Sequence, residues 1–247
     1  MINALTSDDS LPVIDCGPGW LVIEKPVGMS VHNDPQGDLC AVLKVYLRSN
    51  QSLAKALCLD PEYGLHPVHR LDKETSGVIL LACRRKVFQH FSLQFSQGEV
   101  LKRYLALVHG MVPQTESWGL WQWPLSPKAA GRRNIQGQGK HSPSSTRFRV
   151  LECSPHYTLL ACQPLTGRTH QIRRHAALAG HPIVGDQRYG SLRACRYVAR
   201  HYGFTRLALH ADELRVIPPD SAELQTFESA GLPMEIKKLI EGDRTID

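Results

Sequence analysis

Long apolar runs are missing from this sequence. No segment approaches the roughly 18 consecutive apolar residues that a membrane-spanning helix needs. The N-terminus, Met1 to Asp9, also lacks the basic start and the apolar middle of a secretory signal. Hydrophobic residues make up 42% of the 247 residues and charged residues 21%, as is ordinary for a globular protein. We therefore expect a cytoplasmic protein with no membrane partner.

Closely spaced cysteines are missing as well. The seven cysteines are odd in number, widely spread, and never form a C-x-x-C pair. This pattern favours reduced thiols over a disulfide framework or a zinc site. His66 and His69 are three residues apart, but Pro67 lies between them and no further ligand follows at a fixed spacing, so we expect no metal there. No nucleotide-binding motif is present, and we expect no cofactor.

Acidic residues are almost absent from the segment between Ser117 and Gly185, where the only acid is Glu152. The same segment carries nine cations: Lys128, Arg132, Arg133, Lys140, Arg147, Arg149, Arg168, Arg173 and Arg174. A run of charge is usually a solvated surface. A long basic segment with so few acids instead favours a polyanionic partner, because each phosphate that is neutralised releases counterions. We therefore expect the partner to be a nucleic acid.

A polar loop that leads into a buried strand is the most informative stretch that is present. The residues HRLDKETSG (69–77) precede Val78–Ala82, a short aliphatic run that is typical of a strand. Reacting groups are often carried on loops held by a rigid scaffold, and Asp72 lies in this one. Composition alone favours a structural turn, because Asp, Ser, Thr and Gly are all turn formers.

The stretch HRLDKETSG resembles the signature loop of the RluA family of RNA pseudouridine synthases. Three further stretches resemble the other motifs of that family in order: KPVGMSVH (25–32), KRYLALVHG (102–110), and TGRTHQIRRH (166–175) with its continuation GHPIVGD (180–186). The resemblance runs from about Trp20 to about Val216. It implies an enzyme that converts a specific uridine in structured RNA to pseudouridine without a cofactor.

The resemblance also implies roles for individual residues. Asp72 is the catalytic residue, Arg173 is its ion-pair partner, Tyr104 lies against the target base, and Arg70 enters the RNA near the flipped-out uridine. An adjacent guanidinium would keep the carboxylate ionised. Taken by itself, Tyr104 would be interpreted as a half-buried core tyrosine, and the signature loop is what favours the functional role. We expect further RNA contacts from Lys102, Arg132, Arg133, Lys140, Arg168, His170 and Gln171.

One residue and two segments have open interpretations. Lys25 could be a solvated surface lysine, or it could support the Asp72 loop or contact RNA. Residues 126–145 are broken repeatedly by Pro and Gly, which fits a flexible loop that grips RNA or a disordered linker. The segment from Gly190 to Phe204 is longer than expected, and its role is open.

The element pattern and the family resemblance together predict an α+β protein. We expect a mixed, mainly antiparallel central sheet with flanking helices and a basic cleft, the pseudouridine synthase fold. The organisation expected is an N-terminal tail (1–10), one catalytic domain (11–220) and a polar C-terminal tail with a possible helix (221–247). Apolar spacing predicts helices near 39–47, 86–97 and 170–179, and strands near 13–14, 20–23, 78–82, 102–110, 146–151, 157–162 and 206–211.

Two other functions are compatible with these features. The chain could be a catalytically inactive RNA-binding protein on the same fold, although the presence of Asp72, Tyr104 and Arg173 argues against a loss of catalysis. It could instead hydrolyse a glycosidic bond, but such enzymes usually need a second carboxylate, and no motif places one. We expect a monomer that acts on a stem-loop of rRNA or tRNA. The sequence does not name the RNA or the uridine.

Overall fold

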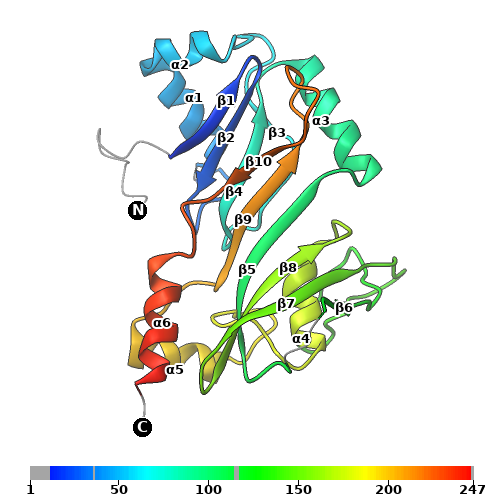
Figure 1. The fold of residues 1–247 in the computed structure, drawn as a ribbon, viewed down its shortest axis with the longest axis vertical. Coiled ribbons are helices and arrows are strands. Elements are labelled where there is room, and N and C mark those ends of the chain that lie inside the picture. The colour runs from blue at the N-terminus through cyan, green and yellow to red at the C-terminus, as the bar shows by residue number, and fades with distance from the viewer. Residues whose placement is uncertain (1–11, 36, 114–116, 246–247) are drawn as a thin grey trace. The chain divides into compact units, whose positions relative to one another are not determined.

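The computed structural model describes residues 12–35, 37–113 and 117–245, which divide into two compact units. Unit 1 comprises the described residues up to Leu101 together with Glu213–Ser229. Unit 2 comprises the described residues of Lys102–Asp212 and those from Ala230 onward. Figure 1 labels the elements of both units. The expected N-terminal tail (1–10) lies outside the described residues.

Unit 1 is a sheet with three helices. Its strand order is β1-β2-β4-β9, with β3 paired to β4 and β10 paired to β9. The pairings β1/β2, β2/β4, β3/β4 and β9/β10 are antiparallel. The strands are β1 (Val13–Gly17), β2 (Trp20–Lys25), β3 (His66–Pro67), β4 (Ser76–Ala82), β10 (Gln225–Glu228) and the second half of β9 (Leu209–Val216). The helices are α1 (Leu39–Ser49), α2 (Gln51–Ala56) and α3 (Arg85–Gln97).

Local sequence explains the main elements of unit 1. All seven residues of β4 are buried, as its continuous apolar run predicts. Helix α1 begins at the expected cap, where the Asp38 side chain accepts the N–H of Ala41 at 2.9 Å. Helix α3 ends at Gly98, whose left-handed conformation (φ 75°) is typical of a helix C-terminus.

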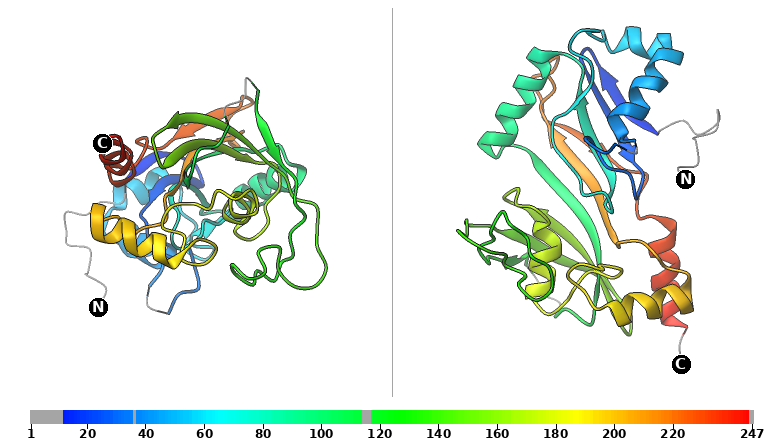
Figure 2. Two further views of the ribbon diagram at one scale, coloured as in Figure 1. Left: turned by 90° about the horizontal axis from the view of Figure 1, so that it is seen from below. Right: turned by 180° about the vertical axis from the view of Figure 1, so that it is seen from behind.

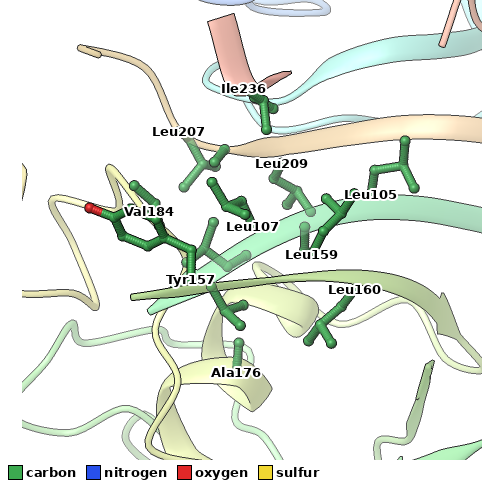
Figure 3. Packing of buried hydrophobic residues seen from close by; sticks show 14 of the residues in the cluster. Leu105, Leu107, Tyr157, Leu159, Leu160, Ala176, Val184, Leu207, Leu209 and Ile236 are labelled. Carbon is green, nitrogen blue, oxygen red and sulfur yellow. The ribbon is translucent and has the colours of Figure 1, made fainter. Parts of the chain in front are cut away.

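Unit 2 is a second sheet region with three helices, in the strand order β9-β5-β8-β7-β6. The pairings β5/β8, β7/β8 and β6/β7 are antiparallel. The strands are β5 (Leu101–His109), β6 (Gly119–Trp121), β7 (Thr146–Cys153), β8 (Tyr157–Pro164) and the first half of β9. The helices are α4 (Gln171–Leu178), α5 (Leu192–Tyr202) and α6 (Met234–Arg244). Figure 3 shows side chains of β5, β8, β9, α4 and α6 meeting in its core.

The predicted α+β class and the mainly antiparallel sheet are confirmed by these pairings. Residues 221–247, expected as a polar tail with a possible helix, contain β10 and α6, and Ile236, Leu239 and Ile240 of α6 belong to the core of unit 2. The segment with an open role, Gly190 to Phe204, forms α5. Among the described residues, no helix is long and apolar enough to span a bilayer.

Candidate active site

The loop that carries Asp72 is held by unit 1 at both of its ends. At the start, the His69 ring stacks on Phe95 with a centroid distance of 5.1 Å, and its Nε2 accepts the N–H of Leu80 at 3.1 Å. At the end, the backbone oxygen of Asp72 accepts the N–H of Thr75 at 3.0 Å. The Asp72 side chain is half-buried. The loop is therefore a fixed support for this carboxylate.

Lys25 is a buried lysine that ties the first motif to this loop. Its side chain is 0% exposed, and its Nζ donates to the backbone oxygens of Pro26 at 2.8 Å, Met29 at 2.8 Å and Lys73 at 3.3 Å. The N–H of Gly28 also donates to the Lys73 oxygen, at 2.9 Å. The interpretation of Lys25 as a solvated surface lysine is wrong, and its interpretation as a support of the Asp72 loop is confirmed.

Replacing Lys25 with methionine should destabilise unit 1 and misplace the loop. Methionine fills a similar volume but leaves the carbonyls of Pro26, Met29 and Lys73 without this donor, so we expect the free energy of unfolding to fall by about 2–4 kcal/mol. A loop shifted by about 1 Å should lower enzymatic turnover by about 10²-fold. Urea denaturation and a turnover assay on the same preparation measure the two effects.

Lys73→Met is the matched control for this prediction. The Lys73 side chain is 52% exposed and pairs with Asp34 at 3.1 Å, and a surface ion pair of this kind contributes less than about 1 kcal/mol. Equal stability losses in the two variants would contradict the supporting role of Lys25.

Arg173 is a buried arginine held by a carboxylate within unit 2. Its side chain is 4% exposed, and Nε and Nη2 donate to Oδ2 and Oδ1 of Asp186 at 2.8 and 3.0 Å. The guanidinium also lies over the Tyr189 ring, 5.5 Å from its centroid. This two-pronged contact fixes the plane in which the guanidinium presents its donors.

Asp186 is a supporting residue to which the sequence assigned no role. Burial alone raises the pKa of its carboxyl, but the hydrogen bonds and charge of Arg173, with the N–H groups of Arg188 and Tyr189 at 2.9 and 3.0 Å, hold the pKa below its usual value. The preceding Gly185 has a φ of 77°, and a Cβ there would lie 1.9 Å from the Arg206 oxygen. The stretch GHPIVGD was the only sign of this pair, because it ends in an acid just after the acid-poor segment.

The remaining residues of the predicted site lie in different surroundings. Tyr104 is half-buried in β5, pairs with Cys162 of β8 and packs against the core of unit 2. Burial lowers the pKa of Lys102. His170 adopts a left-handed conformation (φ 53°), and its Nδ1 lies 2.9 Å from the Tyr189 hydroxyl. Arg70 and Arg168 are exposed.

Gln171 is 5% exposed and bonded through both atoms of its amide group. Its Oε1 accepts the Thr166 hydroxyl at 2.6 Å and the Arg168 N–H at 3.1 Å, while Nε2 donates to Ser145 O at 2.9 Å and to Thr146 Oγ1 at 3.0 Å. This arrangement favours a supporting role for Gln171 over the predicted direct contact with RNA.

The basic segment 126–145 is tied to α4 by a second buried arginine. Arg174 is 0% exposed and donates to four backbone oxygens, those of Ile135, Ser126, Thr169 and Gln136. The bridge Lys128↔Gln138 pairs the segment with itself, and the bridge Leu125↔Ser142 ties it to the residue just before it. The disordered-linker interpretation is therefore wrong. The exposed cations of this loop are Lys128, Arg132, Arg133 and Lys140.

Asp72 belongs to unit 1, whereas Tyr104 and Arg173 belong to unit 2. The approach of Asp72 to these two residues, and the basic cleft around it, stay predictions. Within residues 12–35, 37–113 and 117–245, no three His, Cys, Asp or Glu side chains are grouped so that they could hold a metal ion.

The known proteins that this chain resembles are RNA pseudouridine synthases. A family model described as RNA pseudouridylate synthase matches residues 19–178. The chain is 35% identical over 235 residues to the ribosomal large subunit pseudouridine synthase C of Vibrio vulnificus. This match covers 91% of this chain and 67% of that protein. For the protein of the same name from Haemophilus ducreyi the identity is 36% over 229 residues, covering 89% of this chain and 65% of the relative. The chain thus spans about two thirds of the length of these relatives.

Solved structures share the fold. The human RNA pseudouridylate synthase domain containing 4 superposes with a TM-score of 0.72 at 24% identity, covering 93% of this chain and 92% of that one. The human RNA pseudouridylate synthase domain containing 1 superposes with a TM-score of 0.67, also at 24% identity, covering 96% of each chain. At this identity the similarity establishes a common fold.

Proposed function

Because the chain belongs to the RNA pseudouridylate synthase family, we propose that it isomerises a uridine of ribosomal large-subunit RNA, with Asp72 as the group that reacts. Membership confirms the predicted family and the class of enzyme, an RNA pseudouridine synthase, with RNA as its partner. The reaction breaks the glycosidic C–N bond, turns the detached uracil and rejoins it to the ribose through carbon, without net oxidation.

The single observation that carries the role of Asp72 is the way its loop is held. The buried ammonium of Lys25 and the N–H of Gly28 both donate to the backbone oxygen of Lys73, the residue after Asp72. The N–H of Thr75 donates to the backbone oxygen of Asp72 itself. A carboxylate that attacks the sugar or the base, or removes a sugar proton, must be positioned before the substrate arrives. Such a fixed loop supplies that positioning.

Arg173 is proposed to act as the cation that keeps Asp72 ionised. A guanidinium has five N–H donors in a planar fork and can hold two carboxylates at once. The Asp186 carboxylate accepts hydrogen bonds from Nε and Nη2 of Arg173 and so sets the orientation of the guanidinium. Tyr104 would supply a flat ring to retain the uracil while it turns.

Ribosomal large-subunit RNA is preferred over tRNA as the substrate because the relatives described above are named for that subunit. A base inside a helix is inaccessible, so the uridine has to leave its stack before reaction. The exposed Arg70 in the Asp72 loop fits the predicted role of entering the RNA beside that uridine. The stem-loop form of the target, the monomeric state and the cytoplasmic location stay predictions from the sequence.

The exposed cations of the basic loop are expected to set the salt dependence of RNA binding. Replacing Arg132, Arg133 and Lys140 with glutamine should weaken binding about 10- to 100-fold at moderate salt. It should also reduce the slope of log K against log salt by up to about 2–3, because each of the three lost phosphate contacts removes about 0.7–0.9 from the slope. Filter binding over a series of salt concentrations measures both quantities. An unchanged slope would exclude the loop as an RNA contact.

The proposed function is tested with unmodified transcripts. The purified protein should form pseudouridine at a defined position in a large-subunit RNA transcript and not in a pool of tRNA transcripts, with mass spectrometry as the readout. Release of free uracil without pseudouridine would favour glycosidic hydrolysis instead. RNA binding without any product would favour the catalytically inactive alternative.

A further inference from the structure

Helix α5 carries a row of arginines that no part of the proposed reaction uses. Between Gln187 and Ala211 the sequence contains five arginines and no acid. Arg193, Arg196 and Arg200 lie on α5, three and four residues apart, and all three are exposed. Residues with this spacing lie on one face of a helix. The outer face of α5 is therefore a continuous basic ridge.

A pocket lined by aromatic side chains lies beside this ridge. Its volume is about 390 Å³, within the range of pockets that bind small ligands and large enough for one nucleotide. Helices α5 and α6, which contribute to its wall, lie next to each other in both views of Figure 2. The ring-bearing residues that line it are His109, His156, Tyr157, Tyr197 and Tyr202. Arg193 belongs both to this lining and to the ridge.

The rings at the edge of the pocket are available for stacking. Tyr197 is 50% exposed, and its ring lies against that of His201 with centroids 4.3 Å apart and planes 32° from parallel. The ring centroid of Tyr202 lies 6.4 Å from that of Tyr197. Proteins bind single-stranded RNA with this combination of an exposed tyrosine and nearby arginines: a base stacks on the ring, and the arginines bind the phosphates.

The one acid of the pocket wall does not oppose such a ligand. Asp243 is 0% exposed and accepts the Ser154 hydroxyl at 2.6 Å, the His156 N–H at 2.9 Å and, at 2.8 Å, His156 Nδ1. These hydrogen bonds lower the pKa of its carboxyl against the opposing effect of burial. The carboxylate is thus engaged with the protein and holds His156, whose side chain is 65% exposed, in one orientation.

We propose that α5 is a second RNA-binding site, in which Arg193, Arg196 and Arg200 hold backbone phosphates and the adjacent pocket takes an unpaired base against Tyr197. The partner rests on the proposed function, since RNA is the substrate, but the site does not involve Asp72. Arginine suits this role because its planar fork binds phosphate oxygens in pairs. The site would extend recognition to RNA beyond the reacting uridine.

Two variants test the site through binding alone. Arg193→Gln/Arg196→Gln/Arg200→Gln should weaken the affinity for a large-subunit RNA transcript about 10- to 100-fold and reduce the salt slope by up to about 2–3. Tyr197→Ala should weaken it about 5- to 100-fold, the cost of one lost stack, and leave the slope unchanged. The matched control is Lys237→Gln/Lys238→Gln, which removes exposed charge from α6.

The outcomes separate this proposal from the proposed function. If the α5 triple variant and the α6 control have the same affinity and slope, or if Tyr197→Ala binds like the wild type, the second site is excluded. A wild-type protein that makes no pseudouridine but shows these losses of binding would overturn the proposed function and leave the α5 site standing. If the α5 triple variant lost affinity for an acidic protein but kept the wild-type affinity for RNA, α5 would be a protein-binding surface, and its assignment as an RNA contact would be overturned.

Discussion

Replacing Asp72 with asparagine should abolish pseudouridine formation, with a loss of at least about 10³-fold, while RNA affinity stays within about an order of magnitude. The amide has nearly the shape of the carboxylate but can neither attack carbon nor accept a proton at neutral pH. The loop should keep its form, because its bonds to Lys25, Gly28 and Thr75 run through backbone oxygens. Product formation under single-turnover conditions and a binding titration measure the two quantities.

The matched control for this variant is Glu62→Gln, which makes the same chemical change at an exposed acid of unit 1. It should retain the turnover and the RNA affinity of the wild type. Turnover that survives in Asp72→Asn would remove Asp72 from the chemistry. A loss of RNA binding as large as the loss of turnover would instead indicate a binding role.

Replacing Arg173 with lysine should lower turnover by at least about 10²-fold and destabilise the protein by roughly 3 kcal/mol. An ammonium cannot reproduce the two contacts that Arg173 makes to Asp186, at 2.8 and 3.0 Å. The buried charge of the Asp186 carboxylate would then lose part of the hydrogen bonding that stabilises it. The orientation in which the proposed partner of Asp72 presents its donors would change at the same time. Single-turnover kinetics and urea denaturation of the purified variant test both effects.

Arg147→Lys is the control for Arg173→Lys, because it makes the same exchange at an exposed position of β7. It should leave the stability within about 0.5 kcal/mol of the wild type. A full loss of turnover in Arg173→Lys with unchanged stability would mean that Asp186 does not depend on the fork. Wild-type turnover would exclude Arg173 from the site.

The elements that could be predicted from the sequence are those whose apolar pattern faces a core. Strand β4 is buried along its whole length, and α3 buries Val87 and Phe91 on one face. Helix α2 has no buried residue, and α5 buries only Val198. Helix α2 therefore leaves no apolar stripe to detect, whereas Leu192, Cys195, Val198 and Tyr202 recur on α5 at helical spacing, so that α5 could have been predicted from the sequence.

The candidate site could be predicted as a set of motifs but not as a set of contacts. Lysine is normally solvated, and the carbonyls that Lys25 binds meet only when two distant segments fold together. The pairing of Arg173 with Asp186 likewise depends on how the chain returns after α4. Gln171 looked like a polar group for RNA, yet its amide is used within the fold. Spacing along a sequence does not record such long-range partners.

The most direct test of the central claim is a pseudouridine map of the large-subunit RNA from three strains: one that lacks the protein, one complemented with the wild type and one complemented with Asp72→Asn. We predict that one or a few pseudouridines disappear without the protein, return with the wild type and stay absent with Asp72→Asn at equal protein levels. The same modified positions in the wild-type and Asp72→Asn strains would contradict the claim that this carboxylate performs the reaction.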